Sequence, residues 1–138
     1  MFMANQIESV YQGNLRTQAT HLASSNAIIT DAPTDNNGKG EAFSPSDLVC
    51  AALGSCMMTI MGIVAERDGV DLKDVTWKTT KVMTSSPRKI GEIHIEFNFP
   101  KELNFDDKYK QKLENAAHTC PVALSLSNEI KQVVNFNF

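Results

Sequence analysis

The apolar positions of this chain follow a period of two in some segments and a helical period in others. In residues 91–99, every second residue from Ile93 to Phe99 is apolar and the residues between them are polar. This alternation is typical of a half-buried β-strand. Residues 75–82 have strand-forming composition as well, so the two segments predict a β-hairpin.

The N-terminal part of the chain shows a second hairpin pattern. Two short runs, residues 7–12 and 15–22, flank the dipeptide Gly13-Asn14, which suits a tight turn with positive φ. A third short strand is expected at residues 27–30. The following stretch, residues 31–43, is rich in Asp, Asn, Gly and Pro and is therefore expected to be a loop.

A helix is expected to begin at Ser44. Ser44 can cap it, Pro45 suits its first position, and Asp47 can complete a capping box. The eighteen residues 48–65 then contain no charged side chain, and a run of this length just reaches the range of a membrane span. Several small and polar residues interrupt this apolar run, so the pattern favours a helix buried on all sides in a core and no membrane segment.

Small residues recur along one face of this helix. Ala51, Ser55, Thr59 and Gly62 are separated by four, four and three positions, so they share a face that another backbone could approach closely. Two interpretations remain open for the segment that covers this face. It is either a partner subunit or the chain's own sheet.

The C-terminal third predicts two helices and a final strand. Residues 105–117 have apolar positions at helical spacing, a break falls at Thr119-Cys120-Pro121, and a short helix is expected over residues 122–130. The chain then closes with a strand, VVNFNF. The complete order, β-β-β-α-β-β-α-α-β, predicts an α+β fold with antiparallel sheet in a single domain, residues 1–138.

Composition and charge exclude some classes of partner and compartment. Thirteen Lys and Arg against sixteen Asp and Glu give a net charge of −3, and no long basic run suggests a nucleic-acid surface. The first residues lack the features of a secretory signal, so the cytoplasm is the expected location. In a reducing compartment, an odd number of cysteines favours free thiols, metal ligands or redox chemistry over structural disulfides.

The three cysteines differ in their expected surroundings. Cys50 and Cys56 lie six residues apart on one helix, about 9 Å along its axis and about 120° around it, so they cannot form a disulfide. Cys50 is expected to be a small buried hydrophobic residue. Cys56 shares its side of the helix with apolar residues, and such a setting leaves a thiol unreactive unless a cation lies nearby.

Cys120 directly precedes Pro121, so it can cap the last helix, where the free N–H groups and the helix dipole favour a thiolate. A redox pair of Cys56 and Cys120 is therefore one hypothesis. A metal site is a weaker alternative: Cys56, His118 and Cys120, with His21 or His94 as a fourth ligand, do not have the spacing of a zinc site. No metal and no cofactor are expected.

One helix motif and a distant dipeptide together resemble a known family. The motif is the segment Ser44-Pro45-Ser46-Asp47-Leu48-Val49-Cys50-Ala51-Ala52-Leu53-Gly54-Ser55-Cys56, and Gly69 and Cys120-Pro121-Val122 follow it. Together these residues resemble the osmotically inducible protein C and organic hydroperoxide resistance (OsmC/Ohr) family. The resemblance spans most of the chain. It implies antiparallel sheets packed around two long central helices in an intertwined homodimer, with active sites at the subunit interface.

The resemblance also implies a thiol peroxidase that reduces organic hydroperoxides. Cys56 matches the family's peroxidatic cysteine, Cys120 its resolving cysteine, and Arg16 its arginine. In this role Cys56 is oxidised to a sulfenic acid, and Cys120 condenses with it to a disulfide. An external dithiol, for example one of the lipoyl type, then reduces that disulfide.

Two further expectations concern the surroundings of Cys56. Leu53, Met57 and Ile60 are predicted to line an apolar substrate pocket suited to alkyl or lipid hydroperoxides. The hydroperoxide resistance branch has a glutamate ten residues before the peroxidatic cysteine, where this chain has Ser46. The carboxylates nearest in sequence are Asp47 and Glu41, and this departure places the chain in an OsmC-like branch. The alternative function is a dimer that binds a small apolar or electrophilic ligand in the same pocket without turnover.

Overall fold

The computed structural model describes residues 4–138, which form two compact units joined within a helix. The first unit runs to Leu48 and the second comprises residues 49–138. The structure does not test whether residues 1–138 act as one domain, and that expectation stays a prediction.

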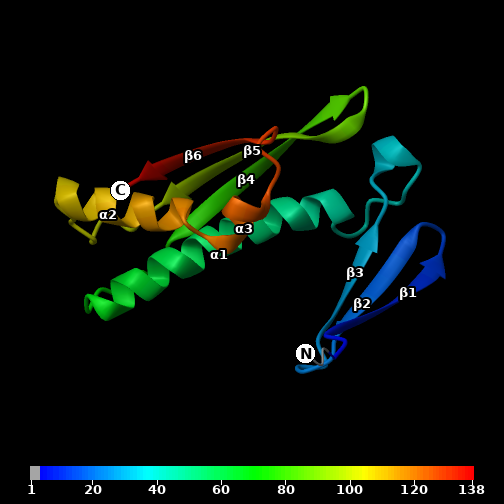
Figure 1. The fold of residues 1–138 in the computed structure, drawn as a ribbon, viewed down its shortest axis with the longest axis horizontal. Helices are drawn as coiled ribbons and strands as arrows, with labels where there is room; N and C mark the ends of the chain where they lie inside the picture. Colours follow the sequence, from blue (N-terminus) through cyan, green and yellow to red (C-terminus); the bar gives the residue numbers. More distant parts are fainter. Residues whose placement is uncertain (1–3) are drawn as a thin grey trace. The chain divides into compact units, whose positions relative to one another are not determined.

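The first unit contains a three-stranded antiparallel sheet. Its strands are β1 (Ile7–Gly13), β2 (Arg16–His21) and β3 (Ala27–Asp31), in the order β1-β2-β3 (Figure 1). The predicted N-terminal hairpin and third strand are confirmed. The turn between β1 and β2 has positive φ at Gly13, Asn14 and Leu15, one residue more than the sequence predicts. A short 3-10 helix, η1 (Thr34–Asn36), interrupts the loop that follows.

The long helix α1 (Pro45–Arg67) begins with the predicted capping box. The Ser44 hydroxyl accepts a hydrogen bond from the backbone N–H of Asp47 at 3.1 Å, and the Asp47 carboxylate accepts one from the N–H of Ser44 at 3.0 Å. These two bonds satisfy N–H groups that a helix start would otherwise leave unpaired.

The second unit is built on another three-stranded sheet. It contains β4 (Thr76–Ser85), β5 (Arg88–Asn98) and β6 (Lys131–Asn137), in the order β4-β5-β6. The hairpin of β4 and β5 is confirmed. The expectation of purely antiparallel sheet is wrong, because β6 pairs with β5 in parallel. Two helices separate these strands in the chain, and such a long crossover allows a parallel neighbour.

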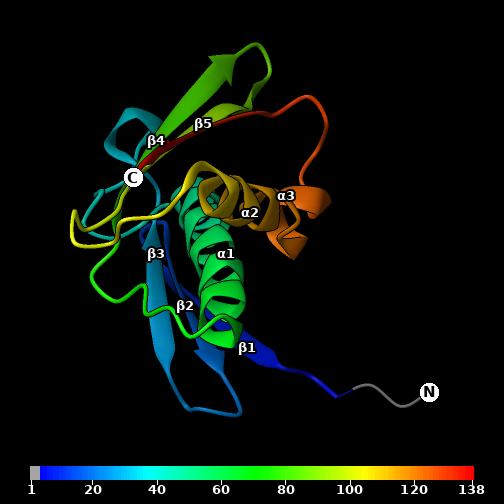
Figure 2. The same ribbon diagram turned by 90° about the vertical axis from the view of Figure 1, so that its left-hand side faces the viewer.

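The crossover contains α2 (Asp107–His118) and α3 (Pro121–Ser125). The predicted short helix over residues 122–130 is wrong in its length, because α3 ends at Ser125 and Leu126 has extended backbone. Both α1 and α2 lie on the same face of the second sheet (Figure 2). The α+β class is therefore confirmed.

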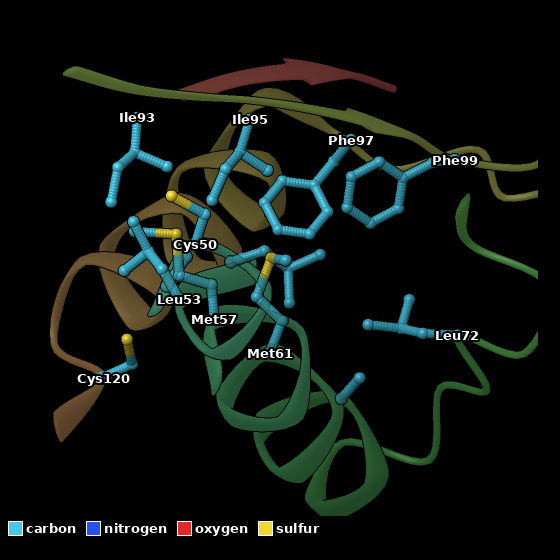
Figure 3. Close-up of a cluster of buried hydrophobic side chains, with 13 residues drawn as sticks. Cys50, Leu53, Met57, Met61, Leu72, Ile93, Ile95, Phe97, Phe99 and Cys120 are labelled. Atoms are coloured by element: carbon cyan, nitrogen blue, oxygen red, sulfur yellow. The ribbon is translucent and has the colours of Figure 1, made fainter. Parts of the chain in front are cut away.

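The core of the second unit lies between β5 and the helices. Ile93, Ile95 and Phe97 point from β5 toward Leu53 and Met57 of α1, and all five side chains are almost completely buried (Figure 3). Every second residue of β5 from Ile93 onward enters this core, as the alternation predicts. The same core includes Leu113 and Ala117 of α2.

A glycine permits the close approach of α1 to β4. A Cβ atom at Gly54 would lie 2.6 Å from Nε1 of Trp77 and 3.0 Å from its Cδ1. Trp77 also packs against Phe97, with ring centroids 5.9 Å apart. The indole therefore occupies the space that any side chain at Gly54 would need.

Burial of α1 on all sides is not observed within one chain. Its buried residues follow helical spacing along one face, whereas Val49 and Ile63 have 36% and 42% of their surface exposed. The reason is that a single sheet can cover only one side of a helix. The helix α1 is long and apolar enough to cross a membrane, but core helices of soluble proteins meet the same criterion. The expected absence of a membrane segment therefore stays a prediction.

Candidate functional site

In the first unit, Arg16 forms a two-point ion pair with Asp31. Arg16 is the first residue of β2 and Asp31 the last of β3, and the two are directly opposite each other in the antiparallel register. Nε of Arg16 donates to Oδ1 of Asp31 at 2.7 Å, and Nη2 donates to Oδ2 at 2.8 Å. The planar guanidinium matches the carboxylate in this geometry, which fixes both position and orientation.

Glu41 is the second carboxylate of this cluster. Nη2 of Arg16 lies 3.4 Å from Oε2 of Glu41, and the backbone N–H of Glu41 donates to Oδ2 of Asp31 at 3.1 Å. The two side chains differ in exposure, 2% for Asp31 against 65% for Glu41. Asp31 is therefore the sheltered partner of the arginine, and Glu41 is a solvated one.

These contacts favour the charged forms of Asp31 and Arg16. The hydrogen bond from Arg16 holds the pKa of Asp31 below its ordinary value of 3.8, although burial acts in the opposite direction. The hydrogen bond to Asp31 likewise raises the pKa of Arg16 above its ordinary value. Lys39 adds a further favourable charge near Asp31. Arg16 is thus a permanent cation whose charge two neighbouring carboxylates offset.

Asp31 is the member of this cluster that the sequence did not single out. The loop was expected to begin at this residue, whereas β3 extends to include it. The backbone N–H of Asp31 donates to the carbonyl of Phe43 at 3.0 Å, which ties the end of the strand to the end of the loop. Counting the β2–β3 register back from its turn would have placed Asp31 opposite Arg16.

The remaining predicted carboxylate, Asp47, serves the start of α1. Its carboxylate accepts from the N–H of Ser44, as a capping box requires. Ser46, at the position where the hydroperoxide resistance branch has glutamate, lies 3.2 Å from the hydroxyl of Ser44.

In the second unit, the structure brings Cys56 and Cys120 together although 64 positions separate them in the sequence. The Cys56 side chain is near enough to Cys120 to contribute to a raised pKa of the Cys120 thiol. Cys56 is partly exposed on α1, whereas Cys120 is completely buried between α2 and α3. Neither is in a disulfide. Two neighbouring thiols, one accessible and one sheltered, are the arrangement that a reversible dithiol–disulfide cycle needs.

Cys120 caps α3 as predicted, but its thiol is not activated. Its Sγ accepts a hydrogen bond from the backbone N–H of Ala123 at 3.3 Å, which lowers the thiol pKa. Burial outweighs this contact and raises the pKa of Cys120 above its ordinary value of 9.0, and the neighbouring Cys56 side chain raises it further. The expectation of a thiolate at Cys120 is therefore wrong, because desolvation disfavours the charged form.

Cys50 belongs to the core, as expected. Only 3% of its surface is exposed, and it lies among the apolar side chains of α1 and β5 (Figure 3). Among the described residues, no three His, Cys, Asp or Glu side chains gather to hold a metal ion. The ligands of the weaker metal alternative are therefore not assembled within residues 4–138.

The predicted pocket residues differ in exposure. Leu53 and Met57 have no exposed surface and pack in the core, whereas Ile60 is partly exposed. A surface cleft of about 690 Å³ follows the C-terminal half of α1 and includes Met58 and Ile63. Neither Cys56 nor Cys120 lines this cleft.

Comparisons with known proteins place these observations in a family context. A family model described as OsmC-like protein matches residues 38–135. A crystal structure from Psychrobacter arcticus 273-4, provisionally named as an osmotic stress induced and detoxification response protein, is 47% identical. The match covers 99% of this chain and 98% of that one, with a TM-score of 0.94. No curated protein matches this chain.

More distant structures share the fold. The organic hydroperoxide resistance protein OsmC of Legionella pneumophila is 16% identical, with a TM-score of 0.73 over 100% of this chain and 99% of that one. The organic hydroperoxide resistance protein OhrB of Bacillus subtilis is 17% identical, with a TM-score of 0.63 over 95% and 97% of the two chains.

Proposed function

The chain belongs to the OsmC/Ohr family, and from this premise we propose that it is a cysteine-based peroxidase that reduces organic hydroperoxides. The observation that carries the proposal is the proximity of the Cys56 and Cys120 side chains, which are 64 positions apart in the sequence. Their different exposures suit different roles. The accessible thiol reacts with the peroxide, and the sheltered thiol reacts with the product of that step.

The reaction proceeds in two chemical steps. The thiolate of Cys56 attacks the terminal oxygen of the hydroperoxide, the O–O bond breaks, and Cys56 becomes a sulfenic acid. The alkoxide leaving group takes up from the solvent the proton that Cys56 released on ionising, and it departs as the alcohol. The sulfur of Cys120 then attacks Cys56, its proton leaves with the hydroxyl as water, and a disulfide forms. An external dithiol restores both thiols by exchange and is itself oxidised to a disulfide.

Arg16 is the proposed cation of this site. A guanidinium stays protonated at any physiological pH, so it can stabilise a thiolate and donate hydrogen bonds to peroxide oxygens. The ion pair with Asp31 holds it in one orientation. The proposal places this chemistry in the reducing cytoplasm, where free thiols persist.

A homodimer is part of the proposal. Both faces of the β1–β3 sheet carry exposed apolar side chains, with Val10 and Ile29 on one face and Tyr11 and Ile28 on the other. A small sheet with apolar faces in water needs a partner element to cover it. A second copy of the chain supplies that cover. The cleft along α1 does not include Cys56, so the second copy also completes the surroundings of this cysteine.

Steady-state turnover tests the proposed activity. We expect consumption of cumene hydroperoxide in the presence of dihydrolipoamide or dithiothreitol, and we expect it to fall to the uncatalysed rate in Cys56→Ser. The matched control is Cys50→Ala, which alters a core cysteine of the same helix and should retain turnover per folded molecule. Equal rates for the wild type and Cys56→Ser would refute the peroxidase and leave ligand binding without turnover.

A further inference from the structure

We propose that Asp31 is the positioning residue for Arg16, which fixes the guanidinium so that its Nη1 edge is the one presented to the hydroperoxide. This inference rests on the proposed peroxidase function and adds a residue to it. The carboxylate that orients the arginine comes from the end of β3, not from the first turn of α1. Asp31 acts through Arg16 and does not touch the substrate.

The hydrogen bonds of the guanidinium determine which edge is available. Nε and Nη2 both bind the Asp31 carboxylate, and Nη2 also lies next to Glu41. Among residues 4–138, no acceptor is found for Nη1. A guanidinium has five N–H donors in a rigid plane, so two-point binding on one edge directs the opposite donors along a fixed line.

The surroundings of Asp31 explain why this carboxylate is the rigid partner. It is 2% exposed, it lies opposite Arg16 in a hydrogen-bonded strand pair, and its Oδ2 also accepts from the N–H of Glu41. Glu41 is mostly exposed and contacts only Nη2, at a longer distance. Asp47 is engaged with the N–H of Ser44 at the helix start.

Asp31→Asn tests the role directly. The amide keeps the shape of the carboxylate but turns an N–H₂ group toward one of the arginine donors, so the two-point contact is lost. We expect kcat/KM for cumene hydroperoxide to fall by about 10- to 100-fold, the range that misplacement of a reacting group produces. Asp31→Glu keeps the charge on a longer arm and should give an intermediate value.

The matched control is Asp68→Asn. Asp68 also pairs with a cation at short range, 2.7 Å from Nζ of Lys112, but it lies in the second unit, directly after the end of α1. Its loss removes a carboxylate from an ion pair without touching the arginine. We expect kcat/KM to stay within about twofold of the wild type, since a surface pair of this kind contributes little.

A double-mutant cycle separates positioning from a merely structural role. In an Arg16→Met background there is no guanidinium to orient, so Asp31→Asn should change kcat/KM by less than about twofold. The double variant leaves neither charge unpaired, and it should therefore fold even if Asp31→Asn alone does not. If Asp31→Asn fails to fold by itself, Asp31→Glu replaces it in both the wild-type and the Arg16→Met backgrounds.

Two results would overturn the inference. One is a kcat/KM in Asp31→Asn, or in Asp31→Glu where that variant replaces it, within twofold of the wild type. The other is an equal loss of activity from the Asp31 change with and without Arg16. Failure of the peroxidase itself is recognised separately, because the wild type would then show no more turnover than Cys56→Ser.

Discussion

At the residue scale, the two cysteines of the candidate site differ in what controls their reactivity. Cys120 sits at a helix start, a position that by itself favours a thiolate, yet burial keeps it protonated. A sheltered thiol suits the resolving step, because it is protected from direct oxidation until Cys56 has reacted. Sequence position alone predicted the cap but not the burial that reverses its effect.

The pH dependence of alkylation tests this assignment. Since the pKa of Cys120 is raised above 9.0, its thiolate fraction should still be rising at pH 9. Labelling of Cys120 by iodoacetamide should therefore increase about tenfold per pH unit between pH 7 and 9. Peptide mapping by mass spectrometry measures the rate.

The neighbouring Cys56 side chain contributes to the raised pKa of Cys120. Cys56→Ser should therefore make Cys120 label faster at pH 8 than in the wild type. The core variant Cys50→Ala serves as the control and should leave the Cys120 rate unchanged. A labelling rate for Cys120 that levels off below pH 8 would contradict a raised pKa.

At the scale of elements, residue pattern predicted most strands and helices but not their partners. The alternation in β5 and the capping box of α1 are local signals, so the sequence contains them completely. The parallel pairing of β6 depends on where two intervening helices carry the chain, which no local pattern records. Asp31 was missed for a related reason, because its importance comes from its register opposite Arg16.

The packing of α1 against β4 makes a prediction at Gly54. Gly54→Ala should lower the free energy of unfolding by about 1–3 kcal/mol, because the new methyl group collides with the indole of Trp77. Elsewhere in a helix the same change stabilises by up to about 1 kcal/mol. Urea unfolding followed by circular dichroism measures the difference.

Trp77→Val provides the matched background. Without the indole there is room for the methyl group, so Gly54→Ala should then cost less than in the wild type or become stabilising. An equal loss of stability in both backgrounds would show that contact with Trp77 is not the cause.

At the scale of the whole molecule, the β1–β3 sheet presents the clearest need for a partner. Ile7, Val10 and Tyr11 on β1 each have more than half of their surface exposed, and so does Ile28 on β3. The family resemblance led to the expectation of an intertwined homodimer, and this exposed sheet supports it with a physical reason. The sequence did not reveal that both faces of the sheet carry apolar residues.

Sedimentation measures the predicted assembly. The wild type should have twice the mass of the 15.2 kDa chain, and Ile28→Glu should shift it toward the single-chain mass by placing a charge in the covered face. Asn36→Glu, which adds the same charge at an exposed position of η1, should remain a dimer. A wild type that sediments as a single chain at micromolar concentration would contradict the dimer.

Stoichiometric oxidation shows whether Cys56 and Cys120 act as one redox pair. The reduced protein is treated with one equivalent of cumene hydroperoxide per chain, quenched, and mapped by mass spectrometry without reduction. A redox pair should give a single intrachain disulfide between Cys56 and Cys120, with Cys50 still a thiol. Stable sulfenic or sulfinic acid at Cys56 beside an unreacted Cys120 would contradict it.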